Sequence, residues 1–326
     1  MGGERHGLTK PCPNCGLDRS DFWCNGQDLL NFISTHSFEY RRCAGCHSLF
    51  ALDPPTDDEL GKYYPSDYGP YQPPNATTPS RPAALLARVL RPLVVGPSEE
   101  DPLERAIHAF YEPPVAGRSR LLDFGCGSPL FLSGSRTKGW STAGADFQGT
   151  VVAALRAEGH EGFTVASGLD NLPEGTFDRI RMNHVIEHLQ APRATLAGLL
   201  KALKPGGRIH IATPNGGSLS AEVFKEYWLG LDAPRHLCIF TPEGLEEALG
   251  AAGFQGIRVY HECVSKDAVR SLGRVLARRF GGNSGFIARM SASQVNPPFL
   301  DPLARFVARM RRSDRIHAFA GKAKAS

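Results

Sequence analysis

The stretch Arg120–Leu132 reads RLLDFGCGSPLFL, and it decides the fold of the longest part of the chain. Two leucines lead into Asp123, and Gly125 and Gly127 follow before the next apolar residues. This pattern is typical of a short buried strand that ends in a tight turn and opens a helix. Glycine adopts backbone angles that other residues avoid, and it leaves the amides at the helix start open to a ligand. The stretch therefore predicts a ligand-binding turn.

The residues around the turn indicate which ligand it holds. A dinucleotide-binding turn has a third glycine, which would fall at Leu130 and is absent. Asp123 would repel a pyrophosphate but could accept a hydrogen bond from the ammonium group of an amino acid. A second strand, 141–145, leads to Asp146, at the distance where an acid can bind ribose hydroxyls. Adenosine joined to a charged amino acid describes S-adenosylmethionine.

Four segments between about residues 118 and 254 resemble class I S-adenosylmethionine-dependent methyltransferases. They read LLDFGCG, GADF, LPEGTFDRIRMNHVIEHL and LKPGGRIHIATPN. The resemblance implies an α/β fold with a Rossmann-like, seven-stranded, mostly parallel sheet whose last strand is antiparallel. We expect strands near 120–124, 141–146, 162–166, 177–183, 207–213 and 254–263, and a seventh near the chain end. Ser128 and Pro129 depart from the family pattern, so we expect an altered loop with cofactor binding retained.

The resemblance also implies where the cofactor lies, at the carboxyl ends of the parallel strands. The turn would bind its amino-acid end, the second strand its ribose, and the segment after the third strand its adenine edge. The implied cofactor-binding residues are Asp123, Gly125, Cys126, Gly127, Asp146, Phe147, Gly168, Leu169, Asn183 and His184.

Two histidines are candidates for catalytic residues. His236 follows the fifth strand, where family members carry a His-Leu element near the transferred methyl group; it either acts as a base or anchors its loop. His188 follows His184 by four residues, so the two could share a helical face with Glu187 and hold a divalent cation, as related quinol-modifying enzymes do. The alternative is that Glu187 and His188 brace the fourth helix.

The N-terminal segment carries two Cys-x-x-Cys pairs that are typical of a structural zinc site. The four predicted ligands are Cys12, Cys15, Cys43 and Cys46. Bound zinc would supply much of the folding free energy of so small a module. Substitute ligands could come from His36, His47 or Cys24, and a redox dithiol is the other alternative.

These motifs divide the chain into three parts. Residues 1–69 form a zinc-ribbon-like module, 70–116 a linker and helical cover, and 117–326 the methyltransferase domain. A basic helical insertion occupies about 264–312. Four tyrosines end the module and either pack it onto its neighbour or cover the substrate; they are Tyr63, Tyr64, Tyr68 and Tyr71.

Composition is that of an ordinary soluble protein, with 41% hydrophobic and 21% charged residues. We expect a cytoplasmic location, because there is no long apolar run and the start lacks a signal-peptide core. Of the net charge of +4, residues from Arg258 onward contribute +10, from 14 basic and four acidic residues, which leaves −6 for the rest. Arg270, Arg274, Arg278 and Arg279 could attract an anionic acceptor; RNA or a membrane surface is less favoured, and DNA is not expected.

The function that these features favour is O-methylation of a small acceptor, such as a natural product, a sugar or a quinol-like compound. An RNA methyltransferase is the first alternative, although EHL after the fourth strand is usual in small-molecule enzymes. From other classes, the alternatives are an NAD-dependent oxidoreductase and a non-catalytic zinc-ribbon binding protein.

Overall fold

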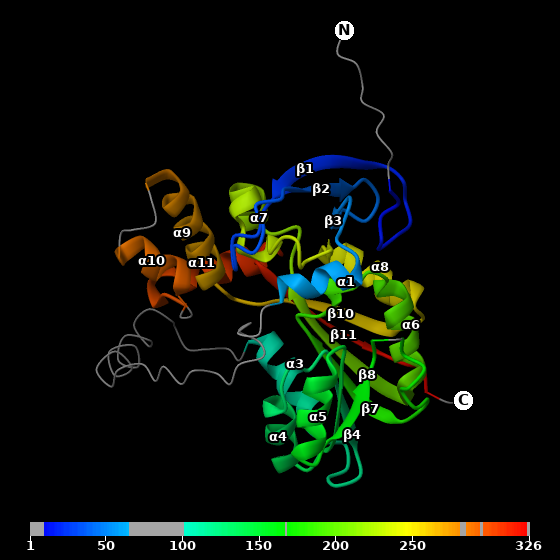
Figure 1. The fold of residues 1–326 in the computed structure, drawn as a ribbon. Helices are drawn as coiled ribbons and strands as arrows, with labels where there is room; N and C mark the ends of the chain where they lie inside the picture. Colours follow the sequence, from blue (N-terminus) through cyan, green and yellow to red (C-terminus); the bar gives the residue numbers. More distant parts are fainter. Residues whose placement is uncertain (1–9, 65–100, 167, 281–284, 294–295, 325–326) are drawn as a thin grey trace.

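The computed structural model describes residues 10–64, 101–166, 168–280, 285–293 and 296–324 (Figure 1). Within these ranges a small sheet lies above a larger one, and helices cover both faces of the larger sheet. The first stretch of the expected helical cover, and Tyr68 and Tyr71 of the tyrosine cluster, lie outside the described residues.

The larger sheet has seven strands, in the order β10-β11-β8-β7-β4-β5-β6. Strand β11 is antiparallel to both of its neighbours, and the other strand pairs are parallel. This confirms the predicted fold class, although β8 begins earlier than the expected fifth strand. The strands are β4 (Arg120–Phe124), β5 (Ser141–Asp146), β6 (Glu161–Thr164), β7 (Phe177–Asn183), β8 (Leu203–Pro214), β10 (Gln255–His261) and β11 (Arg315–Gly321).

Alternate strand residues face two separate helical layers, because successive side chains of a strand point to opposite faces. Leu122 and Ile180 face the main apolar core, which α6 (Pro192–Ala202) and α8 (Pro242–Ala251) complete. The opposite face is covered by α3 (Pro102–Tyr111), α4 (Leu130–Thr137) and α5 (Gly149–Ala157). Both faces are therefore buried, as parallel sheets require.

The smaller sheet takes its strands from two distant parts of the chain. It consists of β1 (Ser20–Gly26), β2 (Phe38–Cys43), β3 (Leu49–Ala51) and the two-residue β9 (Cys238–Ile239). In the β3–β9 pair, Leu49 lies opposite Ile239. Trp23 packs edge-on against Trp228, with ring centroids 6.5 Å apart. The two rings lie in an apolar core formed by the N-terminal residues and by residues 221–239. The N-terminal residues therefore share this apolar core with the segment 221–239, besides a small cluster of their own around the four cysteines and Phe50.

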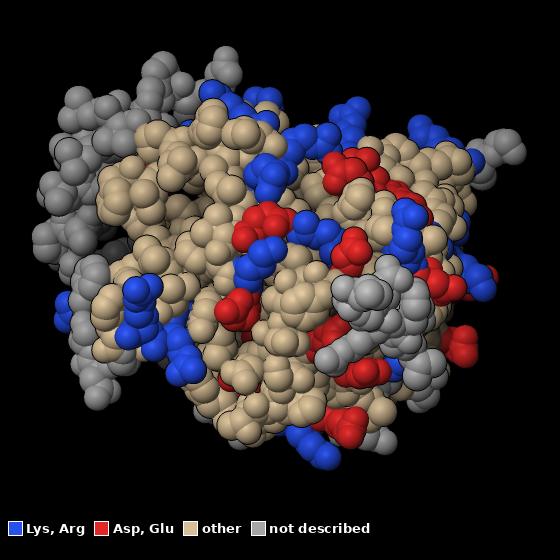
Figure 2. All heavy atoms as spheres, turned by 90° about the horizontal axis from the view of Figure 1, so that it is seen from above, with Lys and Arg blue, Asp and Glu red and all other residues tan. Residues whose placement is uncertain are grey.

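Among the described residues between β10 and β11, where the basic insertion was expected, there are three α-helices. They are α9 (Lys266–Phe280), α10 (Gly285–Ala292) and α11 (Asp301–Arg309). Seen from above, basic and acidic groups are interleaved over the centre and right of the described surface, and basic groups alone are visible at its left (Figure 2). Among the described residues, no helix has both the length and the apolarity to cross a bilayer.

The contact between the cysteine loops and α8 generates a stability prediction. A Cβ atom added at Gly244 would lie 2.4 Å from Ser48 Oγ and 3.1 Å from the Cys46 carbonyl oxygen. We expect Gly244→Ala to lower the free energy of unfolding by about 1 to 3 kcal/mol, because the added methyl overpacks this contact. Gly250→Ala, in the same helix, should be neutral or stabilising, because the added Cβ atom would meet only Ile257 Cδ1, at 3.9 Å. Urea unfolding measures both; equal effects of the two variants would contradict the packing described here.

Candidate functional site

The glycine turn after β4 is shaped by backbone angles and by a close neighbour. Gly125 and Gly127 have φ angles of 70° and 62°, in the region that favours glycine. A Cβ atom on Gly125 would lie 2.4 Å from Val185 Cγ2, so the residue must be glycine for packing as well. Asp146 accepts hydrogen bonds of 3.0 Å from the amides of Gly127 and Gln148. The acid predicted to bind ribose therefore lies directly beside the turn.

Asp123, the acid predicted to meet the cofactor's ammonium group, is fully buried next to the turn. Arg181 Nη1 donates to both of its carboxylate oxygens, at 2.8 and 3.0 Å. Burial raises the pKa of Asp123, and the charge of Arg181 opposes that shift. The contact between Asp123 and the cofactor's ammonium group stays a prediction. If it forms, the Asp123 carboxylate would bind two cations, the ammonium group and Arg181.

The other predicted cofactor residues lie at the carboxyl ends of β4 to β7 or just after them. The Cys126 thiol is 4.0 Å from Asp146 Oδ2, and the half-exposed Phe147 ring meets Phe124 edge-on. Leu169 instead packs towards α6, where a Cβ atom on Gly198 would lie 2.5 Å from it. Gly168 has a φ angle of 118°, and Asn183 ends β7 opposite Ala212.

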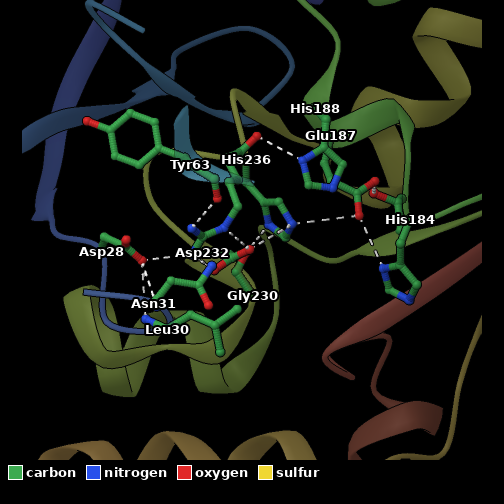
Figure 3. Close-up of polar contacts among 12 residues, drawn as sticks. Asp28, Leu30, Asn31, Tyr63, His184, Glu187, His188, Gly230, Asp232 and His236 are labelled. Atoms are coloured by element: carbon green, nitrogen blue, oxygen red, sulfur yellow. Dashed lines mark hydrogen bonds and ion pairs between the residues drawn. The ribbon is translucent and has the colours of Figure 1, made fainter. Parts of the chain in front are cut away.

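Glu187 is a buried carboxylate at the centre of three histidines (Figure 3). Its Oε1 lies 3.1 Å from His184 Nδ1 and 3.9 Å from His236 Nε2, and its Oε2 accepts a hydrogen bond from Thr213 Oγ1 at 2.9 Å. Burial acts to raise the pKa of Glu187, but the His184 hydrogen bond and the surrounding histidines lower it to about 2. The carboxylate is therefore ionised and available to stabilise a cation.

The histidines are not arranged on one helical face as expected. Ile186–His188 forms a single 3-10 turn, and His184 precedes it with a φ angle of 54°. The helical face that His184 and His188 could have shared is not formed, because His184 has a left-handed backbone conformation and His188 lies in the tight turn. Instead Glu187, His188 and His236 each offer a ligand atom within 4.8 Å of the others. Two imidazoles and a carboxylate suit a divalent cation.

His188 lies under the N-terminal module. Its Nδ1 is 2.9 Å from the Arg235 carbonyl oxygen and 2.9 Å from Tyr64 Oη. Burial, and then the neighbouring His236, lower its pKa to about 4, so the ring is neutral near pH 7. Tyr63 packs against the shared apolar core. Both described tyrosines therefore make the packing contacts that were one of the two expectations.

The loop that carries His236 is held by residues that the sequence did not single out. Arg235 is fully buried; its Nη2 lies 2.9 Å from Asp28 Oδ1 and 2.7 Å from Asp232 Oδ1. Burial would raise the pKa of Asp232, but the Arg235 hydrogen bonds bring it to about 2. The Tyr40 hydroxyl donates to the His236 carbonyl oxygen at 2.8 Å. No local pattern marks Asp28 or Tyr40, because their partners lie about two hundred residues away.

A pocket of about 160 Å³ opens beside this loop. His184 and His236 line it, and Leu30 contributes from the N-terminal module. His236 Nδ1 is 2.8 Å from the Gly230 carbonyl oxygen, so Nδ1 carries the proton and Nε2 is the atom left to accept another. The remaining lining residues are Pro214, Trp228, Leu229, Gly230, Asp232, Asp267, Arg270, Arg274, Asp314 and Arg315.

The four predicted zinc ligands form one cluster. Cys12 Sγ lies 3.7 Å from Cys46 Sγ, and Cys15 Sγ lies 3.4 Å from Cys43 Sγ. Tetrahedral zinc with bonds of about 2.3 Å needs sulfurs roughly 3.8 Å apart, so the thiols fit this ion. Two of the three substitute ligands lie elsewhere: Cys24 is in the shared apolar core, and His36 packs against Phe38. The cluster of the four cysteines is confirmed, and it is compatible with zinc.

The sheet order, the glycine turn and the acid that ends β5 together define the class I methyltransferase fold. A family model described as a methyltransferase domain matches residues 85–259, which is more than half of the chain, and the chain belongs to this family. The resemblance to S-adenosylmethionine-dependent methyltransferases is therefore confirmed. The match supports a methyltransferase over the oxidoreductase and the non-catalytic alternatives.

Several known proteins are similar to parts of this chain. The ubiquinone biosynthesis O-methyltransferase of Idiomarina loihiensis is 29% identical over 136 residues, which are 39% of this chain and 53% of that protein. The biotin biosynthesis bifunctional protein BioHC of Cellvibrio japonicus is 31% identical over 160 residues, 47% of this chain and 32% of that protein. The chain thus spans about half of the first relative and a third of the second. A solved SAM-dependent methyltransferase from Archaeoglobus fulgidus is 17% identical with a TM-score of 0.44, covering 73% of this chain and 94% of that one.

The cysteine cluster generates a prediction about metal content. We expect one zinc per chain by elemental analysis, and we expect Cys43→Ser to lose most of it and to melt at a lower temperature. Cys24→Ala is the matched control, because this buried thiol lies outside the cluster. A Cys43→Ser protein with the zinc content and melting temperature of the wild type would contradict the site.

Proposed function

We propose that this protein transfers the methyl group of S-adenosylmethionine to an oxygen of a small-molecule acceptor. The sulfonium group of that cofactor supplies the chemical drive. The chain's own residues then have to align the acceptor, exclude water and take up the hydroxyl proton. The name of the Idiomarina relative supports oxygen as the acceptor atom, although the chain spans only about half of that protein.

The observation that carries this proposal is the placement of His236 at the pocket wall. The Gly230 carbonyl fixes the proton on Nδ1, so Nε2 is available to accept the proton of an acceptor hydroxyl. Glu187 Oε1 and Asp232 Oδ2 each lie 3.9 Å from Nε2. Two carboxylates at this distance would stabilise the imidazolium that forms when His236 takes up the proton. His236 would thus act as a general base.

A divalent cation is a further part of the proposal, supported by the donor set of Glu187, His188 and His236. Such an ion would bind and polarise an acceptor oxygen at the place where His236 would otherwise accept a proton. The two roles can be separated by assaying after chelation, with the zinc content of the same samples measured. Loss of transfer that magnesium or manganese restores would favour the cation, and unchanged transfer would favour the base.

Replacing His236 should affect the chemical step and leave cofactor binding intact. We expect His236→Gln to lower kcat by roughly a hundredfold or more, because a positioned base contributes about that factor. The dissociation constant of S-adenosylhomocysteine should stay near that of the wild type, since His236 lies outside the glycine turn. His108→Gln, on an exposed helix surface, is the control. A kcat within twofold of the wild type would remove His236 from catalysis.

Replacing Asp146 should instead weaken cofactor binding. We expect Asp146→Ala to weaken S-adenosylhomocysteine binding by about 2 to 3 kcal/mol in calorimetry, because a carboxylate that anchors the turn and would bind ribose is lost. Glu161→Gln, near the amino end of the neighbouring strand, should bind normally. Unchanged binding by the Asp146 variant would contradict the assignment of the cofactor site.

A further inference from the structure

Two arginines of the insertion line the pocket that holds His184 and His236. Arg270 and Arg274 lie four residues apart on α9, so their side chains share one face of the helix. The other two arginines of the predicted basic cluster, Arg278 and Arg279, are exposed near the end of the helix. Only half of that cluster is therefore placed where it could touch a bound acceptor.

The other charged side chains around the pocket already have bonding partners. Arg315 Nε and Nη2 donate to the two carboxylate oxygens of Asp267, at 2.6 and 3.0 Å. Asp232 is bound by two nitrogens of Arg235. Burial raises the pKa of Asp314, on the same pocket wall, to about 6, even though Trp228 and two serines donate to it. Asp314 is therefore mostly ionised at pH 7, and its charge is compensated by three hydrogen-bond donors, Ser218, Ser220 and Trp228.

Arg270 and Arg274 have no such carboxylate partner. Within the described ranges, neither guanidinium forms an ion pair with an acid, and their hydrogen bonds go to backbone carbonyls. Arg270 Nε donates to the Ser291 oxygen at 3.2 Å, and Arg274 Nη1 lies 3.4 Å from the Trp228 oxygen. Burial lowers the pKa of Arg274 to about 10, which still leaves it charged at pH 7. Asp267 and Asp232 lie near enough to act on these charges and to oppose the lowering of the pKa values of Arg270 and Arg274 by burial, but among the described residues no carboxylate is bonded to either guanidinium. Both groups therefore have N–H donors that an anionic ligand could take.

We propose that Arg270 and Arg274 bind an anionic group of the methyl acceptor, a carboxylate or a phosphate, and that this contact directs the acceptor's hydroxyl towards His236. The inference rests on the proposed function and adds the chemical class of the acceptor. The planar guanidinium groups match the paired oxygens of either anion. Three apolar side chains also line the pocket: Leu30, Leu229 and Pro214. They favour an acceptor with an apolar portion between its anionic group and its hydroxyl.

The acceptor would be selected by contacts inside the pocket rather than by long-range electrostatic attraction. Figure 2 shows basic and acidic groups interleaved over the centre and right of the described surface and basic groups alone at its left, whereas Arg270 and Arg274 line the pocket itself. Screening at physiological salt acts over about 8 Å, and it weakens exposed pairs more than half-buried ones. We therefore expect the anion contact to set affinity for the acceptor, and to leave the rate of encounter nearly unchanged.

The test uses the full chain and three small aromatic probes: benzoate, phenyl phosphate and the neutral benzamide. Calorimetry is run on protein saturated with S-adenosylhomocysteine, whose own binding is measured first. We expect at least one of the two anions to bind tenfold or more tightly than benzamide, and the preferred anion identifies carboxylate or phosphate. Arg270→Gln and Arg274→Gln should each reduce that preference at least fivefold, whereas Arg278→Gln, on the same helix and exposed, should keep it.

Equal binding of the anions and benzamide, or no binding of either anion, would overturn the proposal. A preference that survives in both variants would overturn it as well. Arg274→Lys guards against a folding defect: it keeps the charge, so it should retain part of the preference if the site is as proposed. If S-adenosylhomocysteine does not bind, that result counts against the proposed function alone. The preference for anions is then measured on the protein without S-adenosylhomocysteine.

Discussion

The need to neutralise one buried cation, Arg235, organises both parts of this molecule. A guanidinium without access to water requires charged partners, and Arg235 takes one from its own loop, Asp232, and one from the N-terminal module, Asp28. Removing one partner from such a buried pair costs about 3 to 5 kcal/mol in other proteins. The next residue is His236, so the network that holds the module in place also fixes the position of the candidate base.

The elements that could be predicted from the sequence are those with a local cause. Strand β4 and its turn follow from two leucines, an acid and two glycines within eight residues, and β5 and β7 match the expected strands residue for residue. The four cysteines were predictable because each pair forms its own loop. Strand β9 could not be predicted, because two apolar residues in a loop are too few to show the alternating pattern of a strand. Its partner β3 also lies far away in the chain.

Buried polar groups on the sheet were also beyond local prediction. His210 on β8 is 2.7 Å from Tyr111 Oη and 2.9 Å from His317 Nδ1, in a chain of hydrogen bonds that crosses the sheet face under α3. Each of these residues would be costly in an apolar layer, and together they satisfy one another. The same is true of Asp123 and Arg181: the motif identifies the acid, but its partner is supplied by the neighbouring strand.

The two-residue strand β9 limits how the N-terminal module can change. Because β9 completes the module's sheet, a module taken from another protein would need a free strand edge that accepts Ile239. It would also need an acid that reaches Arg235 and a hydroxyl that reaches the His236 carbonyl. The module and the methyltransferase part are therefore inherited, or redesigned, as a matched pair, and neither can be exchanged alone without rebuilding the wall of the pocket.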